Sequence, residues 1–165
     1  MNTIIKANLN TLQKANFLLS NVSNDILTNK SIAPYYSSVG SHLRHILDFY
    51  NCILKPNNVF DLTDRSRDQA VESDCLSALG YLDELTKSLK NLDTIDLTRK
   101  VMVFDDLGSG KVEIEYIYGS LLAQANSHAI HHYAIINYIL DGLNVSVSDK
   151  DFGYNPTTPK PVDLN

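Results

Sequence analysis

The sequence predicts an all-α protein: a four-helix bundle with a short β-hairpin or irregular insertion between helices three and four. Four long segments carry apolar residues at helical spacing. One segment of alternating, β-branched character lies between the third and the fourth. The chain has 165 residues, 44% of them hydrophobic, which is enough for one buried core. We therefore expect a single domain that spans residues 1–165.

The first two helices are separated by a proline. The first is expected over residues 3–28, where apolar side chains recur every three or four positions: Leu12, Ala15, Leu18, Leu19, Val22 and Ile26. The segment "NKSIAPYYSS" interrupts this pattern at Pro34. Ser37 or Ser38 can cap the second helix, because a serine oxygen accepts a hydrogen bond from an unpaired N–H of the first turn. That helix reads "VGSHLRHILDFYNCIL" and ends before Pro56.

The second half of the chain should hold two more helices and the hairpin. The polar stretch "NNVFDLTDRSRDQAVES" is expected to be a loop that leads into a third helix over Val71–Leu89. The segments "LTRKVMVFDD" and "KVEIEY" alternate around the turn signal "LGSG", which predicts a hairpin over Leu97–Glu115. A fourth helix is expected over Tyr118–Asp141, with Gly142 in position to end it.

The tail contains three of the five prolines and is expected to be irregular. Its segment "DFGYNPTTPKP" should pack on the helices near the mouth of the site, with Phe152 and Tyr154 as apolar anchors. The prolines reduce the entropy that ordering this segment costs.

Composition argues against several classes of protein. The net charge of −5, with lysine and arginine scattered, disfavours a nucleic-acid partner, which needs a clustered basic surface. Cys52 and Cys75 form no CxxC pair, which suits a reducing compartment. The N-terminal "MNTIIKANLN" lacks the apolar core of a signal peptide. The sequence contains no run of about 18 apolar residues, so no membrane span is predicted. We expect a cytoplasmic protein without a membrane partner.

The fourth helix carries three histidines within five residues, in "SHAIHHYAIINYIL". At about 100° per residue, His132 lies roughly 40° from His128, and both lie in the middle of the apolar stripe, whereas His131 lies at its edge. A single buried histidine is usually a hydrogen-bonded core residue. Two of them one turn apart each need a partner, or cost a few kcal/mol of lost solvation. Such a pair can converge on one metal ion.

The other two histidines, His42 and His45, lie on the second helix, three residues apart and on one face. One of them, together with His128 and His132, would supply three neutral nitrogens and leave a coordination position open. That is the pattern of a catalytic zinc-type site, and nitrogen ligands also suit nickel and iron. His42 lies nearer the centre of the apolar arc, and His45 lies at its edge, so the helical wheel favours His42 as the third ligand.

Four stretches, in this order, resemble the DinB-like superfamily of bacterial metal-binding four-helix bundles. "SSVGSHLRHILDFY", from Ser37, and "HAIHHYAII", from His128, are similar to the family's helix-two histidine and its helix-four HxxxH. "DRSRDQAVESD", from Asp64, and "DFGYNPTT", from Asp151, resemble one branch of the family. Together they span most of the chain.

The resemblance implies a ligand set for one divalent transition metal ion (Zn, Ni or Fe). In the family register the helix-two histidine stands five residues after the glycine, which selects His45 beside His128 and His132. His42 is then a substitute ligand, or a residue that contacts a ligand or the substrate. His131 is expected to contact a ligand or to face solvent.

The charged residues around Arg65 allow two interpretations. Arg65, Arg67, Asp68 and Glu72 match the R-x-R-D…E pattern of that branch. We favour a network of loop salt bridges between the second and third helices, since charged loop residues are usually solvated or paired locally. The functional alternative is that Arg65 and Arg67 hold an anionic group of the substrate beside the metal.

Members of the resembled superfamily include thiol-dependent S-transferases and hydrolases. The resemblance therefore implies a metal-dependent enzyme in which the ion activates water or a low-molecular-weight thiol toward a small-molecule substrate. Ala129 stands where a metalloprotease HExxH motif has its glutamate, so peptide hydrolysis is not expected. The alternative is a stress-related, non-catalytic helical bundle, with a homodimer as one form, whose histidines bind metal weakly or not at all.

Overall fold

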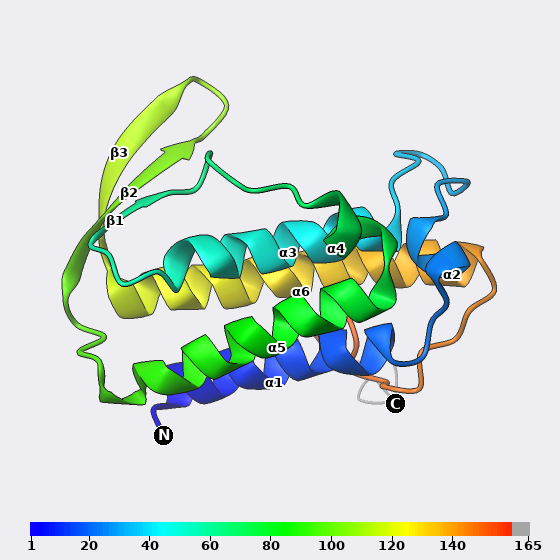
Figure 1. Ribbon diagram of the computed structural model, residues 1–165, viewed down its shortest axis with the longest axis horizontal. Coiled ribbons are helices and arrows are strands. Elements are labelled where there is room, and N and C mark those ends of the chain that lie inside the picture. The colour runs from blue at the N-terminus through cyan, green and yellow to red at the C-terminus, as the bar shows by residue number, and fades with distance from the viewer. Residues whose placement is uncertain (160–165) are drawn as a thin grey trace.

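The structure, a computed structural model, describes residues 1–159, and its main feature is a set of four long helices lying side by side (Figure 1). The long helices are α1 (Thr3–Leu19), α3 (Val39–Ile53), α5 (Cys75–Asn91) and α6 (Tyr118–Gly142). Helix α3 packs against α6, and α1 packs against both α5 and α6. Two short helices, α2 (Asn24–Thr28) and α4 (Gln69–Ser73), pack against each other and against α3. Within the described residues, no helix is both long and apolar enough to cross a membrane.

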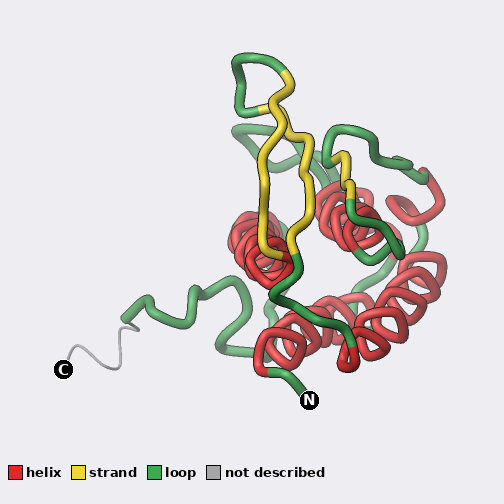
Figure 2. The backbone as a smooth tube through the Cα atoms, turned by 90° about the vertical axis from the view of Figure 1, so that its left-hand side faces the viewer, coloured by secondary structure: helices red, strands yellow, loops and turns green. Residues whose placement is uncertain are grey.

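A three-stranded mixed sheet stands at the end of the helices where α6 begins (Figures 1 and 2). Its strands are β1 (Val59–Asp61), β2 (Lys100–Asp106) and β3 (Lys111–Ile117), in the order β1-β2-β3. Strand β1 runs parallel to β2, and β2 runs antiparallel to β3. Strand β3 leads directly into α6, so the helix that carries three histidines continues from the sheet without a connecting loop.

The predicted all-α four-helix bundle is therefore wrong, because the fold is mixed α/β. The hairpin lies close to its expected range, but a third strand extends it into a sheet. That strand lies in the stretch expected to be a loop, where three residues are too few to show an alternating pattern. Its partner is some forty residues away in the sequence. The hydrogen bonds from Met102 N to Asn58 O and from Leu62 N to Phe104 O, both 2.8 Å, fix its ends.

Two of the predicted helices are each divided in the structure. The helix expected over residues 3–28 is interrupted between α1 and α2, where Ser23 adopts an extended backbone and caps α2 by accepting from Ile26 N. The helix expected over Val71–Leu89 corresponds to α4 and α5, with the extended Asp74 between them capping α5 at Ser77 N. Side-chain caps of this kind compete with helix continuation, which apolar spacing alone does not reveal.

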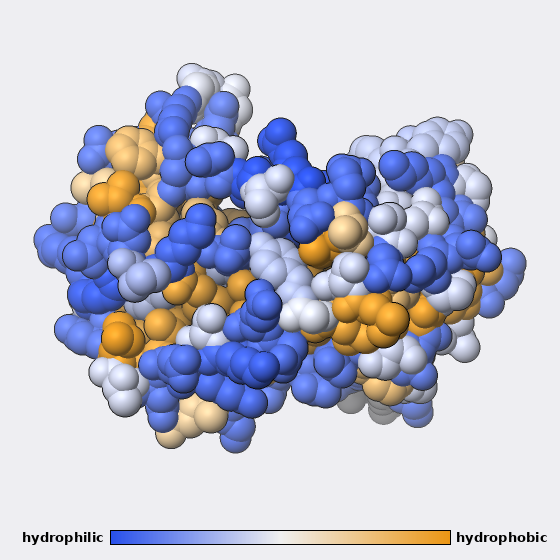
Figure 3. All heavy atoms as spheres, in the orientation of Figure 1, coloured by the Kyte–Doolittle hydropathy of each residue, from blue (hydrophilic) through white to orange (hydrophobic). Residues whose placement is uncertain are grey.

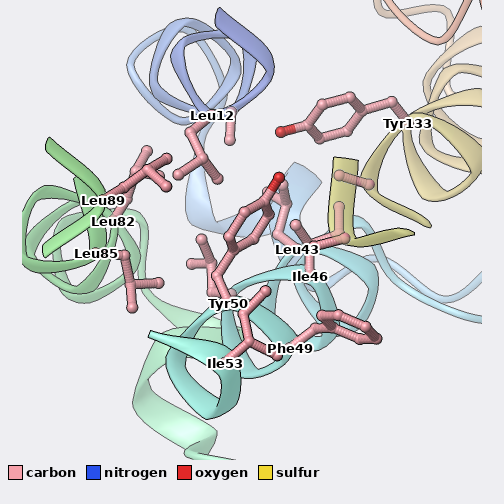
Figure 4. Close-up of a cluster of buried hydrophobic side chains, with 14 of the residues drawn as sticks. Leu12, Leu43, Ile46, Phe49, Tyr50, Ile53, Leu82, Leu85, Leu89 and Tyr133 are labelled. Atoms are coloured by element: carbon pink, nitrogen blue, oxygen red, sulfur yellow. The ribbon is translucent and has the colours of Figure 1, made fainter. Parts of the chain in front are cut away.

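The core lies between the long helices, and two of its buried tyrosines, Tyr50 and Tyr133, are shown in Figure 4. Tyr50 donates its hydroxyl to Asn8 Oδ1 at 2.6 Å, and Tyr133 donates to Thr11 O at 2.9 Å. Both bonds tie a histidine-bearing helix, α3 or α6, to α1. A buried hydroxyl without a partner would be costly, so these bonds also specify how the helices are aligned.

The tail packs on the helices, with one of its two expected anchors buried. Phe152 is buried and stacks on Tyr133, with the ring centroids 4.9 Å apart, whereas Tyr154 is 40% exposed. Tyr133 lies about 140° from His128 around α6, whereas Gly153, Tyr154 and Asn155 line a pocket with His131, so the tail runs along α6 beside His131 and away from His128. Positions 160 and 161 of the expected segment lie outside the described residues.

Candidate metal centre

Helix α3 is held in place at its first turn, just before its two histidines. Ser38 Oγ accepts from Ser41 N at 3.1 Å, and Ser41 Oγ accepts in turn from Ser38 N at 3.2 Å. This reciprocal cap satisfies backbone donors that the helix cannot pair itself. At Gly40 a Cβ atom would lie 1.9 Å from Glu72 O, so α3 approaches the backbone of α4 as closely as only glycine allows. The cap and this contact fix the direction in which α3 presents its histidines.

Three imidazoles from α3 and α6 meet in one place. One ring nitrogen from each of His45, His128 and His132 lies within 4.8 Å of the other two. His45 Nε2 lies 2.9 Å from His128 Nε2, and all three residues are half-buried. Two nitrogens bound to one tetrahedral ion at about 2.0–2.1 Å would lie roughly 3.3 Å apart. The group therefore fits a single transition metal ion after small adjustments of the rings.

The surroundings keep these imidazoles neutral. Burial lowers the pKa of His45 to about 3, with the positive charge of Arg65 as the next cause. Burial, followed by the neighbouring His128 and His45, lowers the pKa of His132 to about 2. The pKa of His128 is also lowered, first by burial and then by Arg65. A metal ion binds only the unprotonated nitrogen, so at neutral pH the three imidazoles are in the form that can bind one.

His42 lies beside the three-histidine group and contacts one of its members. His42 Nδ1 is 2.9 Å from His132 Nδ1, and His42 Nε2 is 2.8 Å from Ser37 Oγ. These contacts permit one consistent set of protons when His132 Nε2 binds an ion. His132 Nδ1–H then donates to His42 Nδ1, and His42 Nε2–H donates to Ser37 Oγ. The hydrogen bonds that link Ser37, His42 and His132 thus orient the His132 ring, as the outer hydrogen bonds of metal sites commonly do.

The fifth histidine, His131, is exposed, and its ring centroid lies 5.3 Å from that of His132. It does not belong to the three-histidine group. Its position one residue before His132 turns it out of the space between α3 and α6, and its charge acts on the cluster only from outside.

Arg65 is the predicted arginine that reaches the cluster. Its Nη1 lies 2.7 Å from His45 Nδ1 and 3.2 Å from His45 Nε2. Arg67, in contrast, has an exposed side chain. The expected salt-bridge network is also different, because Arg44 rather than Arg65 or Arg67 pairs with Glu72, at 3.1 Å. Asp68 serves as the N-cap of α4 by accepting from Ala70 N.

A buried carboxylate on α3 anchors the segment that carries Arg65. Asp48 is 2% exposed and accepts hydrogen bonds from Ser66 Oγ at 2.9 Å and from Arg67 N at 3.1 Å. It also pairs with Arg44 at 3.3 Å. Figure 1 shows this segment, between β1 and α4, running alongside α3, and Figure 3 shows hydrophilic side chains gathered over it. Asp48 therefore determines where Arg65 lies.

Two further polar residues near the cluster were not predicted. Burial lowers the pKa of His128, and the charge of Asp105, on β2, opposes that effect, so this carboxylate lies within electrostatic range of the ligands. Gln124 lies one turn before His128 on α6, and its buried Oε1 has no hydrogen-bond partner among the described residues. The one-turn spacing to His128 was a sequence signal for Gln124. The sequence contained no signal for Asp105, because its position depends on how the hairpin packs against the helices.

Comparisons with protein-family models, with curated proteins and with solved structures found no match. The resemblance to the DinB-like superfamily therefore stays a prediction. The case for a metal centre is made by the side chains of this chain alone.

Proposed function

We propose that His45, His128 and His132 bind one divalent transition metal ion (Zn, Ni or Fe), with at least one coordination position left for a small molecule. The observation that carries this proposal is the convergence of three neutral, half-buried imidazoles from two helices. Three protein ligands and an open position are typical of catalytic rather than structural sites. The proposed activity is of the DinB-like kind, either hydrolysis or transfer to a thiol.

The side chains around the cluster have distinct roles in this proposal. A bound ion would lower the pKa of water or a thiol at its open position and so provide a nucleophile at neutral pH. His42 and Ser37 hold the proton of His132 on Nδ1, which leaves Nε2 free to bind. The charge of Asp105 acts on His128, and in this proposal its carboxylate takes up, through a bridging water, the proton that the nucleophile loses.

Metal content of the untagged protein tests the proposal. The chain is dialysed against a chelator, supplied with excess Zn²⁺ or Ni²⁺ at neutral pH, and freed of unbound ion before metal per chain is measured. We expect one ion per chain for the wild type and for His131→Ala, the matched control on the same helix. His45→Ala, His128→Ala and His132→Ala should each lose stoichiometric metal.

His42→Ala separates a ligand from a residue that orients one. We expect this variant to keep one ion per chain and to bind it roughly 10- to 100-fold more weakly, as is usual when the hydrogen-bond partner of a metal-binding histidine is removed. A wild type that takes up no metal under these conditions would contradict the proposal. The non-catalytic helical protein would then be the better account.

A further inference from the structure

Arg65 is a half-buried cation that lacks a carboxylate partner. None of the ion pairs within residues 1–159 includes it, and the hydrogen bonds of its guanidinium go to the neutral imidazole of His45. Asp48, a carboxylate whose charge acts on Arg65, is already paired with Arg44. A charge removed from water is costly unless an opposite charge or good acceptors compensate it, so this position calls for an anion.

A bound metal ion would take away the acceptor that Arg65 has. His45 faces His128 through Nε2, so Nε2 is the nitrogen placed to bind the ion, and Nδ1 must then carry the ring proton. Arg65 Nη1 lies 2.7 Å from that Nδ1, and a guanidinium has only N–H donors. The N–H groups of Arg65 Nη1 and His45 Nδ1 would then both be donors and could not form a hydrogen bond with each other. Arg65 therefore has to turn to another acceptor when the site is filled.

The place of Arg65 is built by the fold around it. Asp48 holds the residues that follow it, Ser66 through its hydroxyl and Arg67 through its backbone N–H. Arg67 has a φ of 53°, a left-handed conformation that is unfavourable for a residue with a side chain and needs such support. The guanidinium is thus kept beside the cluster by an anchored turn, not by a free surface loop.

We infer that Arg65 binds an anionic group, a carboxylate or comparable oxyanion, of the small molecule that occupies the open position. This inference rests on the proposed function, because it assumes the metal ion. A guanidinium forms paired, charge-assisted hydrogen bonds to a carboxylate, and an ion next to Arg65 adds further attraction for negative charge. The charges of Asp48 and Asp105 both act on Arg65, and Asp48 is already engaged by Arg44, so Asp105 is the competing acceptor for the guanidinium.

The test compares two thiols that differ only in charge. The full chain is loaded with Co²⁺ and titrated with 3-mercaptopropionate and with 3-mercaptopropionamide, and the near-ultraviolet sulfur-to-cobalt band reports binding of each. We expect the wild type to prefer the carboxylate about tenfold or more, the size of one hydrogen-bonded charge pair. Arg65→Gln should lower the ratio of the two affinities about tenfold relative to the wild type, and Arg65→Lys should lower it less. Comparing ratios between proteins cancels intrinsic differences between the thiols.

Arg67→Gln is the matched control, with the same change in the same turn but on an exposed side chain, and it should keep the wild-type preference. Equal affinities in the wild type, binding of neither thiol, a preference that survives Arg65→Gln, or one that is lost equally in Arg67→Gln would each overturn the inference. Wild-type protein that takes up no Co²⁺ would instead overturn the proposed function. One ion per chain in Arg65→Gln shows that its fold and cluster are intact.

Discussion

Replacing Asp48 with alanine is expected to lower the free energy of unfolding by about 3 kcal/mol. The carboxylate is buried and accepts hydrogen bonds from Ser66 Oγ, Arg67 N, the Arg44 guanidinium and, at 3.4 Å, Tyr81 Oη. Alanine removes the acceptor of all four donors and leaves them in a poorly hydrated place.

The size of the loss follows from which donors can find a new partner. A hydrogen bond to a charged group contributes about 1.5–3 kcal/mol, so the sum over the four donors is an upper limit that will not be reached. Arg44 keeps its ion pair with Glu72 at 3.1 Å. Ser66 and Arg67 are exposed residues, so their turn can move outward and reach water. What remains is close to the lower end of the roughly 3–5 kcal/mol that breaking a buried ion pair costs.

Urea unfolding of the metal-free protein measures this loss. Asp83→Ala is the control, because it also removes a carboxylate that pairs with a basic side chain on a helix, but in an exposed place, and it should change stability little. Asp48→Asn keeps the shape and one acceptor oxygen and should fall between the wild type and alanine. A loss below about 1 kcal/mol for Asp48→Ala would refute the reasoning, since it would mean that the anchor is replaceable by water.

Three further outcomes are expected. Gly40→Ala should destabilise the protein by about 3 kcal/mol or more, because its Cβ would lie 1.9 Å from a backbone oxygen, whereas Gly80→Ala, in open space on α5, should stabilise it by roughly 0.5–1 kcal/mol in the same denaturation assay. Phe152→Ala should cost about 3–5 kcal/mol and make the tail faster to cleave in limited proteolysis. Burial lowers the folded-state pKa of His45 to about 3 and of His132 to about 2, so below pH ~6.5 the unfolded chain binds more protons than the folded one. The metal-free protein should therefore lose stability as the pH falls from 7 toward 4, and a flat profile of unfolding free energy against pH would contradict the lowered pKa values.

The lowered pKa values also shift the expected pH dependence of metal binding. From unperturbed histidines, binding would weaken as the pH falls through about 6.5. In the structure, His45 and His132 take up protons only at much lower pH, so protons compete with the ion later in an acid titration. Loss of metal near pH 6.5 would then report loss of the folded state, and circular dichroism recorded on the same samples distinguishes the two.

Features that are set by the geometry of a single helix could be predicted from the sequence. His128 and His132 are one turn apart, so their shared direction follows from helical geometry alone. The choice between His42 and His45 depended instead on how α3 is rotated against α6. The helical wheel favoured His42 because it ranks residues by apolar neighbours. The site lies at the edge of the core, where the segment after β1 covers it and where His45 is found.

Features that depend on distant segments were not readable. Asp48 looks like an ordinary helix-surface residue, and it is buried only because residues 62–68 fold back over α3. Strand β1 exists because β2 pairs with it, and three residues carry no period of their own. Asp105 reaches the cluster through the same sheet. The local pattern therefore predicted the long helices and the hairpin, while the polar residues around the cluster depend on tertiary contacts.

The contact between Arg65 and His45 makes metal and anion binding depend on each other. Without a small molecule, Arg65 competes with the ion for His45 and adds a repulsive positive charge, so Arg65→Gln should bind Zn²⁺ more tightly than the wild type, by up to about tenfold for one lost hydrogen bond. With 3-mercaptopropionate present, the difference in Zn²⁺ affinity between the two proteins should become smaller or change sign, because the anion then pairs with Arg65 in the wild type only. By thermodynamic linkage, the carboxylate must tighten Zn²⁺ binding by the same factor by which Zn²⁺ tightens binding of the carboxylate. Competition with a chromophoric chelator measures both affinities. Weaker Zn²⁺ binding by Arg65→Gln in the absence of ligand would show that Arg65 supports His45 rather than competing for it.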